Sequence, residues 1–83
     1  MIKERVRKFL ETDKDIAPHM HEHLQDSDSL FEKEVLDSLA IIKLISFIEK
    51  EFKIPIGPED ILQDNFTSLD SIGEFVLNKQ KKV

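Results

Sequence analysis

The 83-residue sequence predicts one all-α domain, a four-helix bundle of three main helices and a short third helix. Apolar residues recur at intervals of three and four in three stretches, which is the spacing of amphipathic helices. Residue types that favour helix starts stand where helices are expected to begin. Asp37 precedes the second helix, Pro58 opens the third, and Thr67 or Ser68 precedes the fourth. A long loop is expected between the first two helices.

The first helix is periodic and the segment after it is not. Four apolar residues form one face of a helix that ends near Thr12 or Asp13: Ile2, Val6, Phe9 and Leu10. Residues 14–36 show no sustained periodicity, and we expect Leu24, Leu30 and Phe31 to pin this segment to the core. A connection of this length is typical of functional or mobile loops.

The second helix is expected to begin beside a serine. Asp37 is a good N-cap, because its carboxylate can accept from the second or third helical amide, and Ser38 then lies in the first turn. Unpaired amides and the helix dipole there favour a phosphate ester on the Ser38 hydroxyl. The helix is expected to run to about Phe52 and to face the core with five residues: Ile41, Leu44, Ile45, Ile48 and Phe52. A second stripe, expected to be exposed, starts beside Ser38: Leu39, Ile42 and Ser46.

Two further helices are predicted in the last third of the chain. Pro58 opens a short helix that ends near Leu62 or Asp64. Its apolar anchors are two residues: Ile61 and Leu62. Thr67 or Ser68 caps the last helix. Four residues form its core face: Leu69, Ile72, Phe75 and Val76.

Charge and composition narrow the kind of protein. The formal net charge is −5, and residues 32–74 carry 4 basic and 10 acidic side chains, a net charge of −6. This acidity disfavours nucleic acid as a partner; it either suits proteins with basic docking patches or only keeps the domain soluble. No apolar run reaches the roughly 20 residues of a membrane span, and residues 1–6 lack a signal-peptide pattern. With no cysteine in the chain, we expect a cytoplasmic monomer without stable membrane insertion.

Three histidines lie close together in the loop: His19, His21 and His23. His19 and His23 would share one face of a helix, as zinc ligands do, yet no cysteine or acidic ligand at a recognisable spacing completes a tetrahedral set. We therefore expect no metal site. Solvated histidines would at most make the loop sensitive to mild acid.

The stretch Asp37-Ser38-Leu39 resembles the acyl carrier proteins and the related peptidyl and D-alanyl carrier proteins. The similarity covers about residues 30–77 and continues through a longer set: Leu44, Ile48, Glu49, Glu51, Phe52, Ile54-Pro55-Ile56, Pro58-Glu59-Asp60, Asn65-Phe66-Thr67 and Ile72. It implies an acyl-carrier-like fold and covalent attachment of 4′-phosphopantetheine from coenzyme A at Ser38, with Asp37 and Leu39 at the site. The thiol of this arm would carry acyl intermediates as thioesters, as in fatty acid biosynthesis.

The resemblance also implies partners, namely a phosphopantetheinyl transferase, an acyl-loading ligase or synthase, and acyl-transfer enzymes. Four residues of the second helix are expected to bear on docking: Leu39, Ile42, Glu49 and Glu51. The chain departs from the family pattern at Ala40 and Lys43, where many fatty-acid carriers have carboxylates, which favours a specialised lipid or polyketide-type pathway. Val35 and Leu36 stand where a glycine is common, which predicts a stiffer entry into the helix.

Three alternatives stay open. An aminoacyl carrier of the D-alanyl or peptidyl type is the nearest, since the loading enzyme chooses the cargo. An unmodified interaction module could bind through Leu39 and Ile42, although it would not need Ser38. A small hydrolase would need a base near Ser38, but no histidine lies within its helix and the flanks lack nucleophile-elbow glycines. We therefore expect a carrier that is a substrate of enzymes and is not itself an enzyme.

Overall fold

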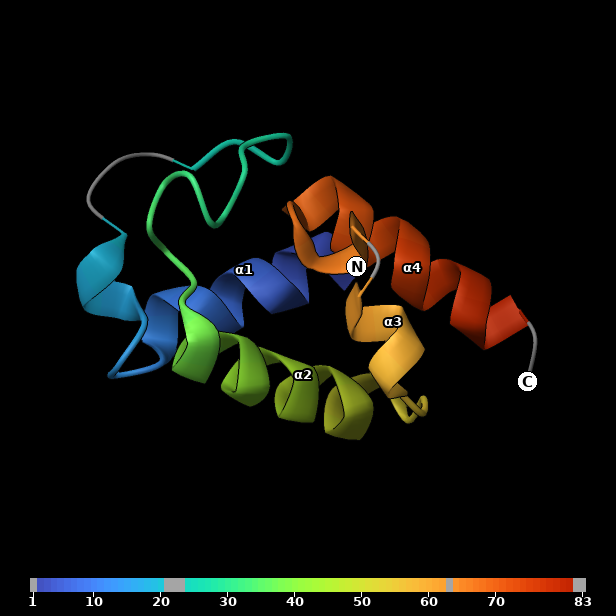
Figure 1. Cartoon of the computed structure of the whole chain (residues 1–83). Helices are drawn as coiled ribbons and strands as arrows, with labels where there is room; N and C mark the ends of the chain where they lie inside the picture. The colour runs from blue at the N-terminus through green and yellow to red at the C-terminus, as the bar shows by residue number, and fades with distance from the viewer. Residues whose placement is uncertain (1, 21–23, 63, 82–83) are drawn as a thin grey trace.

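The computed structural model describes residues 2–20, 24–62 and 64–81. It contains α-helices and short 3₁₀ turns, and the described residues form no strand, as predicted for an all-α fold. The elements follow one another in this order (Figure 1): α1 (Ile2–Thr12), η1 (Ala17–His19), α2 (Ser38–Phe52), α3 (Pro58–Leu62), η2 (Asp64–Phe66) and α4 (Leu69–Lys81). Helix α1 packs against both α2 and α4, and the short α3 lies between α2 and α4.

One hydrophobic core joins the helices and the connections between them. Phe9 of α1 stacks on Phe47 of α2 with ring centroids 4.3 Å apart, and Phe66 meets Phe75 of α4 edge to face at 5.2 Å. Burying an apolar side chain of this size contributes about 1.5–3 kcal/mol, so the shared core holds the three main helices together. Its buried members are Val6, Leu10, Ile16, Leu24, Leu30, Val35, Leu36, Ala40, Leu44, Ile48, Ile54, Phe66, Leu69, Ile72, Phe75 and Val76.

The predicted helices and their core faces are confirmed. Helix α1 ends at Thr12, and α2 ends at Phe52. The whole predicted face of α4 is buried, and the half-buried members of the α2 face pack against the core. Ser68 caps α4, because its hydroxyl oxygen accepts a hydrogen bond from the Ser71 amide at 3.1 Å.

The connection between α1 and α2 is packed onto the bundle by side chains that the sequence identified only in part. Leu24 and Leu30 are buried, as predicted, and Ile16 of the same connection is completely buried. The prediction that Phe31 pins this segment is wrong, because 47% of its side chain is exposed. Leu30, its neighbour, occupies the core instead. His21 and His23 lie outside the described residues.

Backbone hydrogen bonds also tie this connection to the start of α4. The Leu30 amide donates to the Thr67 carbonyl at 2.7 Å, and the Asp70 amide donates to the Asp26 carbonyl at 3.0 Å. These contacts join segments that are about 40 residues apart in sequence. Buried side chains and backbone hydrogen bonds therefore both hold the segment that leads to α2.

Helix α3 makes a polar contact with α4, and one of its two predicted apolar anchors is exposed. Ile61 is 43% exposed, so it is not the anchor expected, and the side chain of Leu62 lies outside the description. The carboxylate of Asp60 accepts from the Gly57 amide at 3.0 Å and pairs with Lys79 of α4 at 3.1 Å. This ion pair links the five-residue helix α3 to α4.

Among the described residues, two that are not glycine adopt left-handed backbone conformations. Glu34 has φ 59° and Lys53 has φ 54°. Lys53 directly follows the last residue of α2 and turns the chain toward Ile54, which is buried. The left-handed region is unfavourable for residues with a Cβ, so these two positions depend on the packing around them.

Candidate functional site

The backbone that leads into α2 is fixed by burial. Val35 and Leu36 are 3% and 4% exposed. Their amides donate to the Leu30 carbonyl at 2.9 and 3.2 Å. These contacts agree with the expected stiff entry, because a segment that buries two side chains and shares one carbonyl has little freedom to shift.

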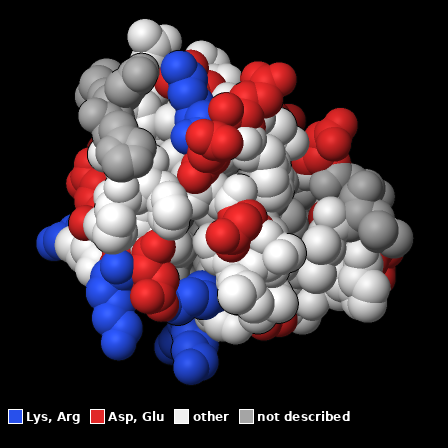
Figure 2. Space-filling view, turned by 60° about the vertical axis from the view of Figure 1, so that its left-hand side comes forward, with Lys and Arg blue, Asp and Glu red and all other residues white. Residues whose placement is uncertain are grey.

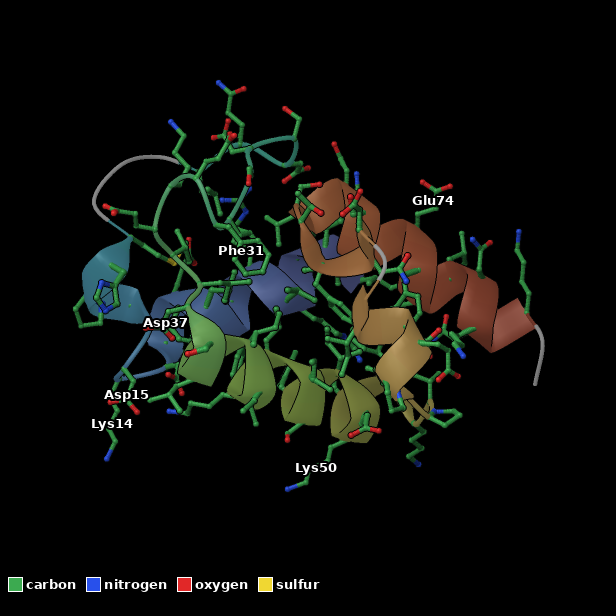
Figure 3. The ribbon with its side chains drawn as sticks, viewed as in Figure 1. Lys14, Asp15, Phe31, Asp37, Lys50 and Glu74 are labelled. Atoms are coloured by element: carbon green, nitrogen blue, oxygen red, sulfur yellow. The ribbon has the colours of Figure 1, made fainter. Side chains whose placement is uncertain are left out.

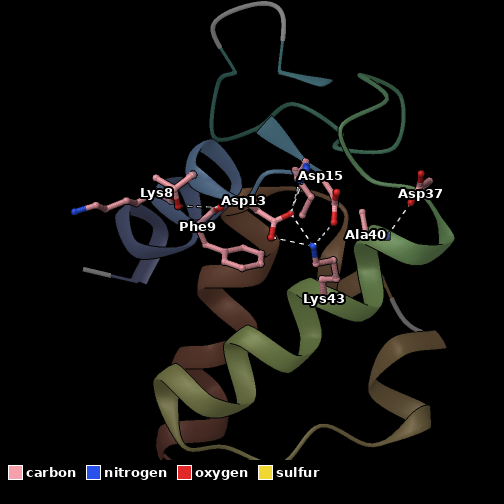
Figure 4. Close-up of polar contacts among 9 residues, drawn as sticks. Lys8, Phe9, Asp13, Asp15, Asp37, Ala40 and Lys43 are labelled. Carbon is pink, nitrogen blue, oxygen red and sulfur yellow. Dashed lines mark hydrogen bonds and ion pairs between the residues drawn. The ribbon is translucent and has the colours of Figure 1, made fainter. Parts of the chain in front are cut away.

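Asp37 caps α2 as predicted. Its backbone is extended, with φ −127° and ψ −170°, and one carboxylate oxygen accepts from the Leu39 amide at 3.0 Å and the Ala40 amide at 2.8 Å (Figure 4). The Asp37 carbonyl accepts the first helical bond, from the Ile41 amide at 3.0 Å. The Ala40 amide, with help from the Leu39 amide and from nearby His19, holds the pKa of Asp37 below its usual value of 3.8.

Ser38 is the first residue of α2 and is exposed. Its hydroxyl makes no hydrogen bond to any residue that the structure describes. The expectation that several unpaired amides would favour a phosphate here needs correction, because Asp37 already accepts from Leu39 and Ala40. What remains is a free hydroxyl on a fixed backbone, at the positive end of the helix dipole.

Beside Ser38, the predicted exposed stripe is confirmed. Leu39 is 73% exposed and Ile42 is 60% exposed, and Ser46 follows on the same face. Further along α2, Lys50 points away from the bundle (Figure 3). Two large apolar side chains this exposed gain nothing from the core, and such pairs are typical of surfaces that contact another protein.

The two predicted docking carboxylates of α2 each make an intramolecular contact. Glu49 accepts a hydrogen bond from the Ile56 amide at 3.1 Å. Glu51 pairs with Arg5 of α1 at 2.9 Å. Glu51 follows Ile42 by nine residues, which is half a turn away around the helix. The structure therefore places Glu49 near the exposed stripe and Glu51 on the side that faces α1.

Sequence patterns gave no sign of an ion cluster beside the start of α2. Lys43 lies between the carboxylates of Asp13 and Asp15, which come from the end of α1 and the connection after it (Figure 4). The only signal in the sequence is that Lys43 is basic on an otherwise apolar and acidic helix start. On the face in Figure 2, acidic and basic side chains are interspersed with uncharged ones.

Two observations on the described residues concern metal binding and a base for Ser38. No group of three acidic or histidine side chains within residues 2–20, 24–62 and 64–81 could hold a metal ion. His19, the one histidine described, makes no hydrogen bond to Ser38 that could activate a nucleophile. In this same part of the chain, every helix is too short or too polar to cross a bilayer.

Comparisons with known proteins give two findings. Residues 2–76 match the family described as "Phosphopantetheine attachment site". A protein of Serratia sp. (strain ATCC 39006), described as probable acyl carrier protein PigG, is 34% identical over 65 residues. That alignment spans 78% of this chain and 67% of the relative. Both matches cover most of the bundle described above.

Proposed function

The chain belongs to the acyl carrier protein family, whose members carry a phosphopantetheine attachment site, and from this premise we propose that Ser38 is the attachment residue. The family predicted from the sequence is the family found. The protein is a carrier, and its cofactor is covalently bound 4′-phosphopantetheine. When bound, this arm supplies a terminal thiol that holds the cargo as a thioester.

The observation that carries the proposal is the position of the Ser38 hydroxyl. It is exposed on the first residue of α2, beside the Asp37 cap, so an enzyme can reach it without unfolding the bundle. Asp37 fixes the backbone by its two amide contacts, and Leu39 projects into solvent next to the serine. These residues fit a group that is attached by one ester bond and extends away from the surface.

Attachment requires a second protein. A phosphopantetheinyl transferase supplies the base that takes the proton of the Ser38 hydroxyl. The Ser38 oxygen bonds to the phosphorus that carries the pantetheine arm of coenzyme A, and the nucleotide part of coenzyme A leaves. The carrier contributes position and recognition, through Asp37, Leu39, Ile42 and Glu49. A carrier needs no catalytic group of its own, and among the described histidines His19 makes no hydrogen bond to Ser38, so we propose that the protein has no enzymatic activity.

We propose that the cargo is an acyl group of a specialised lipid or polyketide-type pathway. The reason is the pair Ala40 and Lys43, which replaces carboxylates common in fatty-acid carriers. Loading and acyl-transfer enzymes would then dock on the same face of α2. A monomer in a reducing compartment such as the cytoplasm suits this role, because the thiol of the arm must stay free. An aminoacyl cargo is the second candidate. Hydroxylamine releases the cargo from the thioester as a hydroxamate, and the mass of this product distinguishes an aminoacyl group from an acyl group.

The test is intact mass after incubation with coenzyme A, magnesium and a broad-specificity phosphopantetheinyl transferase. The wild-type chain should gain one phosphopantetheine, and Ser38→Ala should gain none. Ser46→Ala is the matched control, since Ser46 is exposed on the same face two turns further on, and this variant should be modified fully. A folded wild-type chain without any gain, or a modified Ser38→Ala variant, would refute the proposal.

A further inference from the structure

The ion cluster at Lys43 changes the charge of the face that carries Leu39 and Ile42. The Lys43 ammonium lies 2.6 Å from a carboxylate oxygen of Asp15 and 3.1 Å from the Asp13 carboxylate (Figure 4). One cation and two carboxylates give the cluster a net charge of −1. A lysine that alone would repel a basic partner is therefore part of an acidic group.

The two aspartates have different exposure. The Asp13 side chain is only 13% exposed, and its carboxylate also accepts from the Asp15 and Ile16 amides, both at 3.2 Å. Ile16 is completely buried, so this turn is anchored to the core. The Asp15 side chain is 64% exposed and is held by Lys43. Asp13 is thus the structural member of the cluster, and Asp15 is the carboxylate that another protein can reach.

The cluster lies on the same side of α2 as the exposed apolar pair. Lys43 follows Leu39 by four residues, so the two side chains are neighbours one turn apart on the helix surface. Figure 3 places Asp15 and Asp37 at the same end of the molecule, beside the start of α2. Leu39 therefore lies near both the Asp37 cap and the Lys43–Asp15 pair, and Ile42 follows on the same exposed face.

We propose that Asp15, positioned by Lys43, supplies the acidic edge of the docking surface around Leu39 and Ile42. The partner that this surface fits has an apolar pocket flanked by arginine or lysine side chains. We assign this role first to the phosphopantetheinyl transferase, because it must bring its active site to Ser38. The inference rests on the proposed function, and it adds a docking residue from the connection between α1 and α2.

The test measures transferase kinetics at low ionic strength. Asp15→Asn should raise KM about fivefold with kcat within about twofold of the wild-type value, because edge charges act mainly on encounter. The difference should shrink at about 0.5 M salt, where charges on opposite surfaces are screened. Asp70→Asn is the matched control, since Asp70 is an exposed carboxylate paired with Lys3 at 2.7 Å. Its KM should stay within about twofold of wild type.

A charge exchange tests whether the carboxylate or the local fold matters. In the double variant Asp15→Lys with Lys43→Asp, the ion pair is reversed while the net charge of the cluster remains −1. Because the exposed position 15 then carries an ammonium in place of the carboxylate, KM should stay at least as high as in Asp15→Asn. An exchange variant with a wild-type KM, an unchanged KM in Asp15→Asn, or an equal rise in Asp70→Asn would overturn the inference. A wild-type chain that is never modified would overturn the proposed function itself.

Discussion

The buried and the exposed faces of α2 both carry large apolar side chains, and only one of them packs. Leu44 and Ile48 are completely buried, whereas Leu39 and Ile42 are 73% and 60% exposed. The buried pair holds α2 against the core that α1 and α4 share. The exposed pair stands beside Ser38 without an intramolecular reason to be apolar. The contrast indicates that stability and recognition can be changed separately within one helix.

The strongest way to test the contrast is to truncate the buried face. Leu44→Ala should lower the free energy of unfolding by about 3 kcal/mol, because it leaves a cavity in a filled core. Leu39→Ala, the matched change on the exposed face, should alter it by less than about 0.5 kcal/mol. Urea unfolding followed by circular dichroism measures both. Equal losses in the two variants would contradict the division into two faces.

The reverse experiment truncates the exposed face and measures recognition. Ile42→Ala should lower kcat/KM of the phosphopantetheinyl transferase about tenfold, since a central apolar contact is lost. The urea midpoint should stay at the wild-type value. Leu77→Ala is the control, because Leu77 is 45% exposed on α4. A similar loss in this control would show that exposed apolar groups act non-specifically.

A smaller effect is expected where the two faces meet, at the helix cap. Asp37→Ala removes the acceptor of the Leu39 and Ala40 amides and should lower Tm by about 5 °C. Asp37→Asn, which keeps an acceptor oxygen, should lose less. Thermal unfolding at neutral pH measures both variants. An alanine variant as stable as the wild type would mean that water replaces the cap without loss.

The smallest effect is the dependence of that cap on pH. The pKa of Asp37 is lowered in the folded state, mainly by the Ala40 amide, so its carboxylate adds stability above the unfolded value of about 3.8. This contribution is lost as pH falls through the lower, folded pKa. The Tm difference between wild type and Asp37→Asn should therefore disappear in acid below that pKa. A difference that persists there would assign the stabilisation to something other than the charge.

The helices and their core faces could be predicted because the signals are local. Spacing along the chain identifies Leu44 and Ile48 as buried, and a single residue type at Asp37 marks the start of α2. The same reasoning placed Leu39 and Ile42 on the exposed side. Each of these predictions depends on residues less than five positions apart, where helix geometry alone relates sequence to position.

The features that could not be predicted from the sequence depend on contacts between residues that are far apart in the chain. Ile16 is buried although its surroundings show no periodicity, and Leu30 rather than Phe31 enters the core because backbone bonds to the start of α4 set the orientation. Lys43 meets carboxylates 28 and 30 residues away. The sequence showed only a basic residue where many related carriers have a carboxylate, whereas the fold pairs Lys43 with two carboxylates from the end of α1 and the connection after it.

The left-handed backbone at Lys53 has a practical consequence. This residue reverses the chain at the end of α2 far from Ser38, in a conformation that a glycine adopts without steric cost. The thermal stability of the protein can therefore be raised by a substitution that is distant from its recognition surface. Lys53→Gly should raise Tm by about 3 °C and leave the transferase kinetics unchanged. In the Lys53→Gly variant, the more damaging substitutions on α2 could be introduced while the protein stays folded, so that all α2 variants can be compared.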